Sequence, residues 1–91
     1  MTRVEVEVVN ELGLHLRAAA RFVEEAGRWP CQITVSTTGP AVDGKSLLAL
    51  SSLLARRGAT LNILCDGPDA DAAAAALQAL VASGFPATGG R

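Results

Sequence analysis

The sequence is short of aromatic side chains: its 91 residues include two Phe, one Trp and no Tyr. So few aromatic rings leave little surface on which unpaired bases could stack. Basic residues are not in excess either, because eight Lys and Arg are spread along a chain with nine Asp and Glu and a net charge of −1. A nucleic-acid backbone is gripped by clustered positive charge. Composition therefore argues against nucleic acid as a partner.

Long hydrophobic runs are also missing. No stretch approaches the roughly 20 apolar residues that cross a bilayer, and residues 1–10 alternate where a signal peptide would carry its apolar core. We therefore expect a cytoplasmic protein with no membrane insertion. The two cysteines, Cys31 and Cys65, are too isolated to form a disulfide framework. They are predicted to be buried thiols in strands, with a disulfide or a metal pair as the alternative.

The composition is that of a globular protein, with 49% hydrophobic and 19% charged residues, and the length fits one core. We predict a single domain over residues 1–91, with a core of Leu, Val, Ile and Ala. Alternation of polar and apolar residues predicts a first strand at 3–8 whose three valines face the core. From Leu16 onward apolar residues recur every three or four positions, which predicts a helix that ends before Gly27.

The other elements follow from the same two periodicities and from turn residues. The predicted elements are strands at 3–8, 31–36, 41–43 and 60–65 and helices at 16–26, 47–57 and 70–83. Arg56 and Arg57 would lie in the last turn of the second helix, where cations suit the helix dipole, and Gly58 would follow it. Residues 84–91, rich in Gly and Pro, are predicted to be a flexible tail.

This order of elements predicts the fold class. Strands at such spacing mostly pair antiparallel, with one face for the helices and one for solvent. The order β-α-β-β-α-β-α therefore predicts an α+β fold, a two-layer open-faced β-sandwich.

The single histidine, His15, is the main candidate for chemistry. It lies between a turn and the first turn of the predicted helix. Backbone N–H groups at a helix N-terminus lack partners and form the positive end of the dipole. Such a position disfavours a protonated ring and keeps one ring nitrogen nucleophilic, and the same N–H groups could receive the charge of a phosphoryl group. Arg17 could add a charge-assisted contact to the phosphate oxygens.

Position alone leaves other interpretations of His15 open. A lone histidine at a helix start is often a cap or an exposed bystander. A metal site would need further ligands, and the chain has no second His and no Cys-x-x-Cys. Hydrolytic catalysis would need a positioned nucleophile and an orienting carboxylate, which spacing cannot show.

Two separate segments resemble the HPr family, the histidine-containing phosphocarriers of the bacterial phosphoenolpyruvate:sugar phosphotransferase system. Residues 13–19, GLHLRAA, are similar to the family's active-site segment. Residues 44–53, GKSLLALSSL, followed by RGA at 57–59, are similar to its regulatory-serine segment. The resemblance covers residues 2–83 and implies the family's four-stranded antiparallel sheet covered on one side by three helices.

The resemblance also implies a function. Phosphorylated Enzyme I would phosphorylate Nδ1 of His15, with Arg17 orienting the phosphate. Phospho-His15 would then donate to the IIA domain of a sugar permease, or to a IIA-like regulator. The protein would be a phosphoryl carrier, not an enzyme with its own small-molecule substrate, and would need no cofactor and no metal. A monomer suits a carrier that visits two partners in turn.

Both partners would dock on the first two helices. The resemblance implies a docking surface made of Ala20, Arg21, Leu47, Leu48 and Ser51, with the two leucines as an exposed apolar pair. The residues themselves agree, because the leucines between 47 and 54 exceed what one buried stripe needs and some should face outward.

The roles of Ala18 and Ser46 are not decided by the resemblance. Ala18 stands where the family usually has Pro, which pre-sets φ in the first turn, so the segment should be slightly looser with no reactive atom removed. Ser46 is either a plain N-cap of the second helix or the target of an HPr kinase. A phosphoserine there would add charge beside the docking surface and weaken binding to Enzyme I.

Two other functions remain as alternatives. One is a regulatory HPr-like protein of a nitrogen-related phosphotransfer branch, which acts mainly by protein binding. The other is a metal-carrying domain of similar element order. It would need paired thiols in the first loop, and residues 10–16 contain none.

Overall fold

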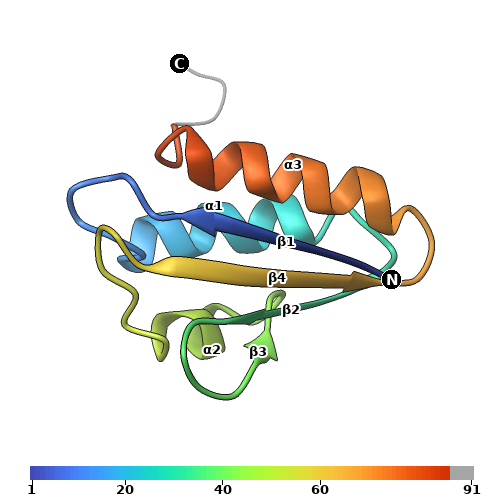
Figure 1. Ribbon diagram of the computed structural model, residues 1–91, viewed down its shortest axis with the longest axis horizontal. Coiled ribbons are helices and arrows are strands. Elements are labelled where there is room, and N and C mark those ends of the chain that lie inside the picture. The colour runs from blue at the N-terminus through green and yellow to red at the C-terminus, as the bar shows by residue number, and fades with distance from the viewer. Residues whose placement is uncertain (87–91) are drawn as a thin grey trace.

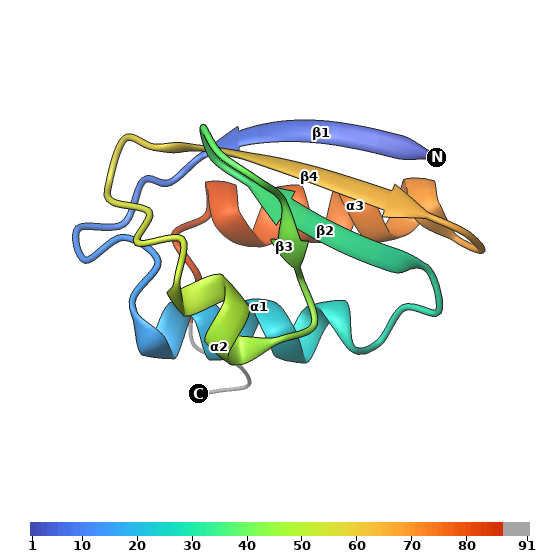
Figure 2. The ribbon, with the colours of Figure 1, turned by 90° about the horizontal axis from the view of Figure 1, so that it is seen from below.

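The computed structural model describes residues 1–86 and shows the predicted order of elements (Figure 1). In chain order these are β1 (Thr2–Glu7), α1 (Leu16–Ala26), β2 (Gln32–Ser36), β3 (Val42–Asp43), α2 (Leu47–Ser51), β4 (Thr60–Asp66) and α3 (Ala70–Ala82). The strands form one antiparallel sheet in the order β1-β4-β2-β3. The three helices lie on one side of this sheet, and the other side is open (Figure 2). The predicted open-faced sandwich is confirmed.

Alternating burial in the strands explains why their pattern could be recognised. In β4, Leu61, Ile63 and Cys65 are fully buried, and the residues between them face the open side. β1 sets Val4 opposite Ile63 and Val6 opposite Leu61, so apolar side chains of neighbouring strands meet on the helix side. The sheet therefore presents one continuous apolar face to the helices.

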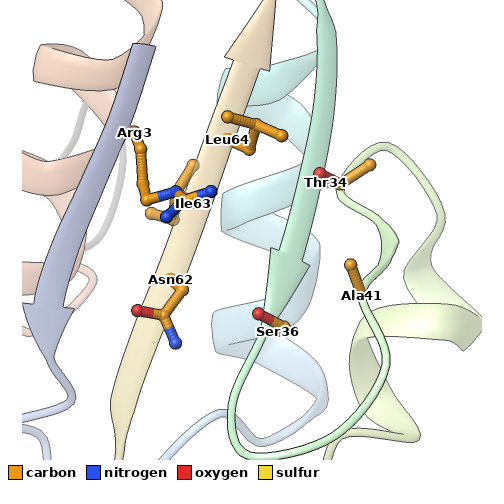
Figure 3. A pocket seen from close by; sticks show the side chains of 7 residues that line it. All are labelled: Arg3, Thr34, Ser36, Ala41, Asn62, Ile63 and Leu64. Atoms are coloured by element: carbon orange, nitrogen blue, oxygen red, sulfur yellow. The ribbon is translucent and has the colours of Figure 1, made fainter.

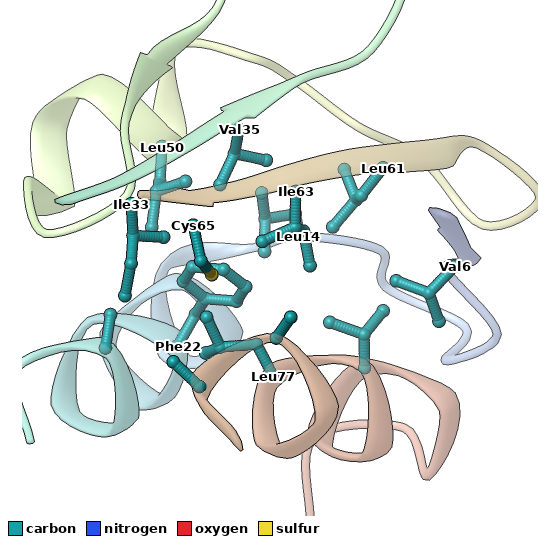
Figure 4. Close-up of a cluster of buried hydrophobic side chains, with 14 of the residues drawn as sticks. Val6, Leu14, Phe22, Ile33, Val35, Leu50, Leu61, Ile63, Cys65 and Leu77 are labelled. Atoms are coloured by element: carbon teal, nitrogen blue, oxygen red, sulfur yellow. The ribbon is translucent and has the colours of Figure 1, made fainter. Parts of the chain in front are cut away.

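The core between sheet and helices is built around a single aromatic ring. Phe22 of α1 is fully buried and lies among Leu77 of α3, Ile63 and Cys65 of β4 and the neighbouring aliphatic side chains (Figure 4). Removing such a ring costs about 3–5 kcal/mol of unfolding free energy. Aliphatic side chains fill most of the remaining core, and buried alanines of α1 and α3 present small side chains to the sheet.

The second helix is much shorter than predicted: α2 ends at Ser51, and the predicted helix to Arg57 is wrong. Leu54 has a φ of +52°, which is incompatible with continued helix. Arg56 and Arg57 therefore lie in a loop instead of a last helical turn. Gly58, with a φ of +93°, turns this loop where the N–H of Ala59 donates to the carbonyl of Arg56 (2.9 Å).

The chain stops being helical after α2 because the backbone of the following loop forms hydrogen bonds with distant segments. The N–H of Leu14 donates to the Ala55 carbonyl (2.9 Å). Val8, just beyond β1, donates to the carbonyl of Ala59 (2.8 Å) and accepts from the N–H of Gly58 (2.7 Å). These tertiary hydrogen bonds outweigh the helical propensity of the leucine-rich segment.

The chain after α3 begins with a hydrogen-bonded turn. The N–H of Gly84 donates to the Val81 carbonyl (3.0 Å) and the N–H of Phe85 to the Leu80 carbonyl (3.1 Å). Phe85 is half-buried and packs against the core. The predicted tail at 84–91 thus starts with ordered contacts at its first two residues, and residues 87–91 lie outside the described part.

Both cysteines are buried and free, as predicted. Cys65 lies in β4, and Cys31 lies one residue before β2. Among residues 1–86, none of the helices combines the length and the apolar character needed to cross a membrane.

The native protein should therefore react very slowly with a thiol reagent near neutral pH. Burial, together with the neighbouring Cys31, raises the pKa of the Cys65 thiol from 9.0 to about 11, so little of the reactive thiolate forms. Titration with an aromatic disulfide reagent should give almost no signal until guanidinium chloride unfolds the chain. Rapid reaction of either thiol in the native protein would contradict the packing of β2 and β4.

Candidate functional site

His15 is the N-cap residue of α1, but its side chain does not cap the helix. Its backbone is extended, with φ −75° and ψ 177°, and its carbonyl accepts the N–H of Ala19 (2.8 Å). The imidazole makes no capping hydrogen bond. The ring is half-buried. The N-cap position is therefore held by a histidine whose ring nitrogens are not used to cap the helix.

The first turn of α1 supplies free donors beside this ring. Within residues 1–86, the backbone N–H groups of Leu16, Arg17 and Ala18 have no hydrogen-bond acceptor. The first turn contains no acidic residue. Aligned N–H groups at a helix N-terminus form a site for an anion. Ala18 contributes one of these donors, which a proline at that position would not have.

A surface pocket joins His15 to the other expected residue of the site. Its lining residues are Asn10, Glu11, Leu12, His15, Leu16, Arg17, Ala20, Gly84 and Phe85. Arg17 is exposed, so its guanidinium can reach a charged group on the imidazole. The structure therefore brings the two predicted phosphoryl-transfer residues, His15 and Arg17, to one hollow.

The loop before His15 is fixed by close backbone packing. The side chain of Asn10 donates through Nδ2 to the Gly13 carbonyl (2.6 Å), and the N–H of Gly13 donates to the Asn10 carbonyl (3.0 Å). Gly13 has a φ of +66°, and a Cβ there would lie 2.5 Å from the Ala55 carbonyl oxygen. Only glycine allows this approach, so Gly13 sets where His15 stands relative to the loop after α2.

The predicted docking residues differ in how they are presented. Ala20 and Leu48 are exposed, but Leu47 is half-buried against the core, so the expected exposed leucine pair is wrong at Leu47. The Arg21 side chain is only 18% exposed and pairs with Glu24 (3.5 Å) and Glu25 (3.7 Å). Ser51 is half-buried too, and among the described residues its Oγ has no hydrogen-bond partner.

Two exposed leucines beside the His15 pocket, Leu12 and Leu16, were not anticipated from the sequence, and Leu54 is one of the leucines between 47 and 54 of which some were expected to face outward. Leu12, Leu16 and Leu54 are 74%, 65% and 79% exposed, comparable to Leu48 at 83%. Leu12 and Leu16 line the His15 pocket, and Leu54 precedes the residue that accepts from Leu14. Figure 2 shows α2 beside α1. Leu16 directly follows His15 and Leu12 lies three residues before it, and this closeness to the candidate reactive residue was the signal that could have revealed both.

Ser46 is the N-cap of α2 in the structure. Its Oγ accepts the N–H of Ala49 (3.2 Å), and its carbonyl accepts the N–H of Leu50 (3.0 Å). The capping role proposed from sequence is therefore real. It is compatible with a second role, because the hydroxyl is only half-buried.

Comparison with known proteins agrees with this geometry. Residues 2–83 match the family model described as "PTS HPr component phosphorylation site". The chain belongs to the HPr family. The phosphocarrier protein HPr of Pseudomonas aeruginosa is 43% identical over 86 residues, which cover 93% of this chain and 96% of that one. Such relatives are named as phosphocarriers, which carry a phosphoryl group and do not turn over a substrate of their own.

Two further similar proteins are an HPr of known structure and a segment of a larger protein. The crystal structure of HPr-C-His from Thermoanaerobacter tengcongensis superimposes with a TM-score of 0.89 at 35% identity, covering 93% of this chain and 96% of that one. The phosphoryl donor subunit DhaM of a PEP-dependent dihydroxyacetone kinase from Klebsiella michiganensis is 40% identical over 82 residues. That match covers 90% of this chain but only 17% of DhaM.

The packing of Gly13 predicts a strong response to a single methyl group. Gly13→Ala should destabilise the protein by about 1–3 kcal/mol, because it combines an unfavourable φ with a backbone clash. Gly39→Ala is the matched control, since a Cβ at Gly39 meets nothing within 4 Å. Denaturant unfolding of both variants measures the difference, and equal stability would contradict the described loop.

Proposed function

We propose that this HPr-family protein accepts a phosphoryl group on Nδ1 of His15 from phosphorylated Enzyme I and passes it to a IIA domain in PEP-dependent sugar uptake. The observation that carries the proposal is the uncapped imidazole of His15 beside three free N–H groups. In each step one P–N bond forms as another bond to phosphorus breaks. No inorganic phosphate is released, and the imidazole of His15 is regenerated when the phosphoryl group passes to the acceptor.

The surroundings of His15 suit the phosphorylated ring. A phosphoryl group brings close to two negative charges near neutral pH. The N–H groups of the first turn and the positive end of the α1 dipole favour an anion at this place. Arg17 adds a mobile cation that can follow the phosphate as it leaves for the acceptor. We assign Arg17 to orienting the phosphoryl group during transfer.

The partners would bind over the exposed apolar residues around the pocket. Leu48 and Ala20 remain from the original docking prediction, with Leu12, Leu16 and Leu54 added by the structure. Leu47, Arg21 and Ser51 would support this surface from partly buried positions. Exposed leucines gathered near a reactive residue are typical of a site that is covered transiently by another protein. We expect the protein to act as a monomer, because one copy carries the whole proposed site. We also expect it to act in the cytoplasm.

A second acceptor is supported by one specific similarity. DhaM, named as a phosphoryl donor subunit, contains a segment 40% identical to this chain. The match supports, as a second use of the same His15 chemistry, phosphoryl donation toward a kinase of the dihydroxyacetone type; the nitrogen-related regulator stays an alternative from the sequence. Transfer assays with a sugar-permease IIA domain and with such alternative acceptors separate these uses.

His15→Ala should abolish phosphorylation while the fold persists. Purified protein, Enzyme I and labelled phosphoenolpyruvate should yield one phosphoryl group per chain, labile in acid and stable in base as a phosphoramidate is. Label retained after His15→Ala would defeat the assignment.

Arg17→Ala should slow transfer to the IIA domain about tenfold or more without preventing it, and unchanged kinetics would remove the role given to Arg17.

We also propose Ser46 as a regulatory phosphorylation site for an HPr kinase. Ser46→Ala should lower stability by about 1 kcal/mol, because the N–H of Ala49 loses its acceptor.

Phosphorylation at Ser46 should instead weaken binding to Enzyme I, because it places negative charge beside the docking leucines. Mass spectrometry after incubation with the kinase and ATP tests the modification, and an unmodified peptide would leave Ser46 with capping alone.

A further inference from the structure

One wall of the His15 pocket comes from the opposite end of the chain. Gly84 and Phe85, which follow α3, line the pocket together with His15, Leu12 and Leu16. Phe85 is half-buried against the core and, among residues 1–86, it is the one Phe, Tyr or Trp in the pocket lining. The turn after α3 thus belongs to the site, although the family resemblance gave it no role.

The turn after α3 lies near the loop that leads to His15. The N–H groups of Gly84 and Phe85 donate to carbonyls at the end of α3, and side chains of the loop border the space beside Gly84. A Cβ at Gly84 would be 3.8 Å from Cβ of Asn10 and 3.9 Å from Cγ2 of Val9. Asn10 in turn holds Gly13 through its side chain. The turn that carries Phe85 therefore lies beside the loop that positions the imidazole.

Phe85 occupies a backbone conformation that glycine would adopt more easily. Its φ is +56°, in the left-handed region that a bulky side chain rarely enters. Strain of this kind persists where the surrounding structure holds it, and it is concentrated at functional sites. A large aromatic residue kept at a strained backbone position and lining a reactive pocket points to a use for its side chain.

The use follows from the chemistry of phosphohistidine. Between partners the phosphoryl group can be lost to water: a water oxygen bonds to phosphorus, the P–N bond breaks, inorganic phosphate leaves and the ring nitrogen takes a proton. Apolar walls that exclude water protect such reactive groups. Given the proposed carrier function, we propose that Phe85 shields phospho-His15 from hydrolytic water while the outer side of the pocket stays open to a protein acceptor.

The phosphohistidine lifetime of matched variants tests this role. Phe85→Ala and Phe85→Gly both remove the ring, and the glycine variant also relieves the positive φ. Phe85→Leu keeps apolar bulk. Val23→Ala is the stability control, because Val23 is likewise half-buried against the core but does not line the pocket. Each protein is phosphorylated with Enzyme I and phosphoenolpyruvate, freed of donor, and followed by release of inorganic phosphate.

We expect hydrolysis to be about threefold faster or more in the Ala and Gly variants and unchanged in the Leu and Val23 variants. An unchanged lifetime in the Ala and Gly variants, or equal acceleration in Val23→Ala, would overturn the shielding role. A parent protein that takes no phosphate would instead overturn the carrier function.

Discussion

A single backbone hydrogen bond, from the N–H of Leu14 to the carbonyl of Ala55, fixes the geometry on which the rest of the site depends. It joins the loop before α1 to the loop after α2, and Gly13 makes room for it by lacking a side chain. The Asn10 side chain and the buried Leu14 hold the same loop. Together these contacts place the imidazole and the free N–H groups beside the loop after α2.

The free N–H groups at the start of α1 explain why one histidine suffices for the proposed chemistry. A phosphoryl carrier must hold its group well enough to keep it, yet loosely enough to give it away. Backbone donors and one exposed arginine stabilise charge without enclosing it. The first turn has no acidic side chain to compete for those donors, and the residue at the N-cap is His15, the proposed phosphoryl acceptor.

The sequence predicted most of the fold because its periodicities are local and regular. β1 alternates strictly, and α1 ends before a glycine, so the existence of these elements could be recognised from residue order. The end of α2 could not, since leucine-rich sequence favours a longer helix and only tertiary hydrogen bonds at Ala55 and Gly58 stop it. The partial burial of Leu47 and the arrival of Phe85 beside His15 depend on distant packing in the same way, and residue spacing carries no trace of either.

The central claim is that the first turn of α1 binds the phosphoryl group carried by His15. Heteronuclear NMR spectra of the protein before and after phosphorylation test it most directly, through the backbone amides of Leu16, Arg17 and Ala18. Large downfield proton shifts at these amides, with little change on the open face of the sheet, are the predicted result. Amides that keep their positions when His15 carries phosphate would contradict the account.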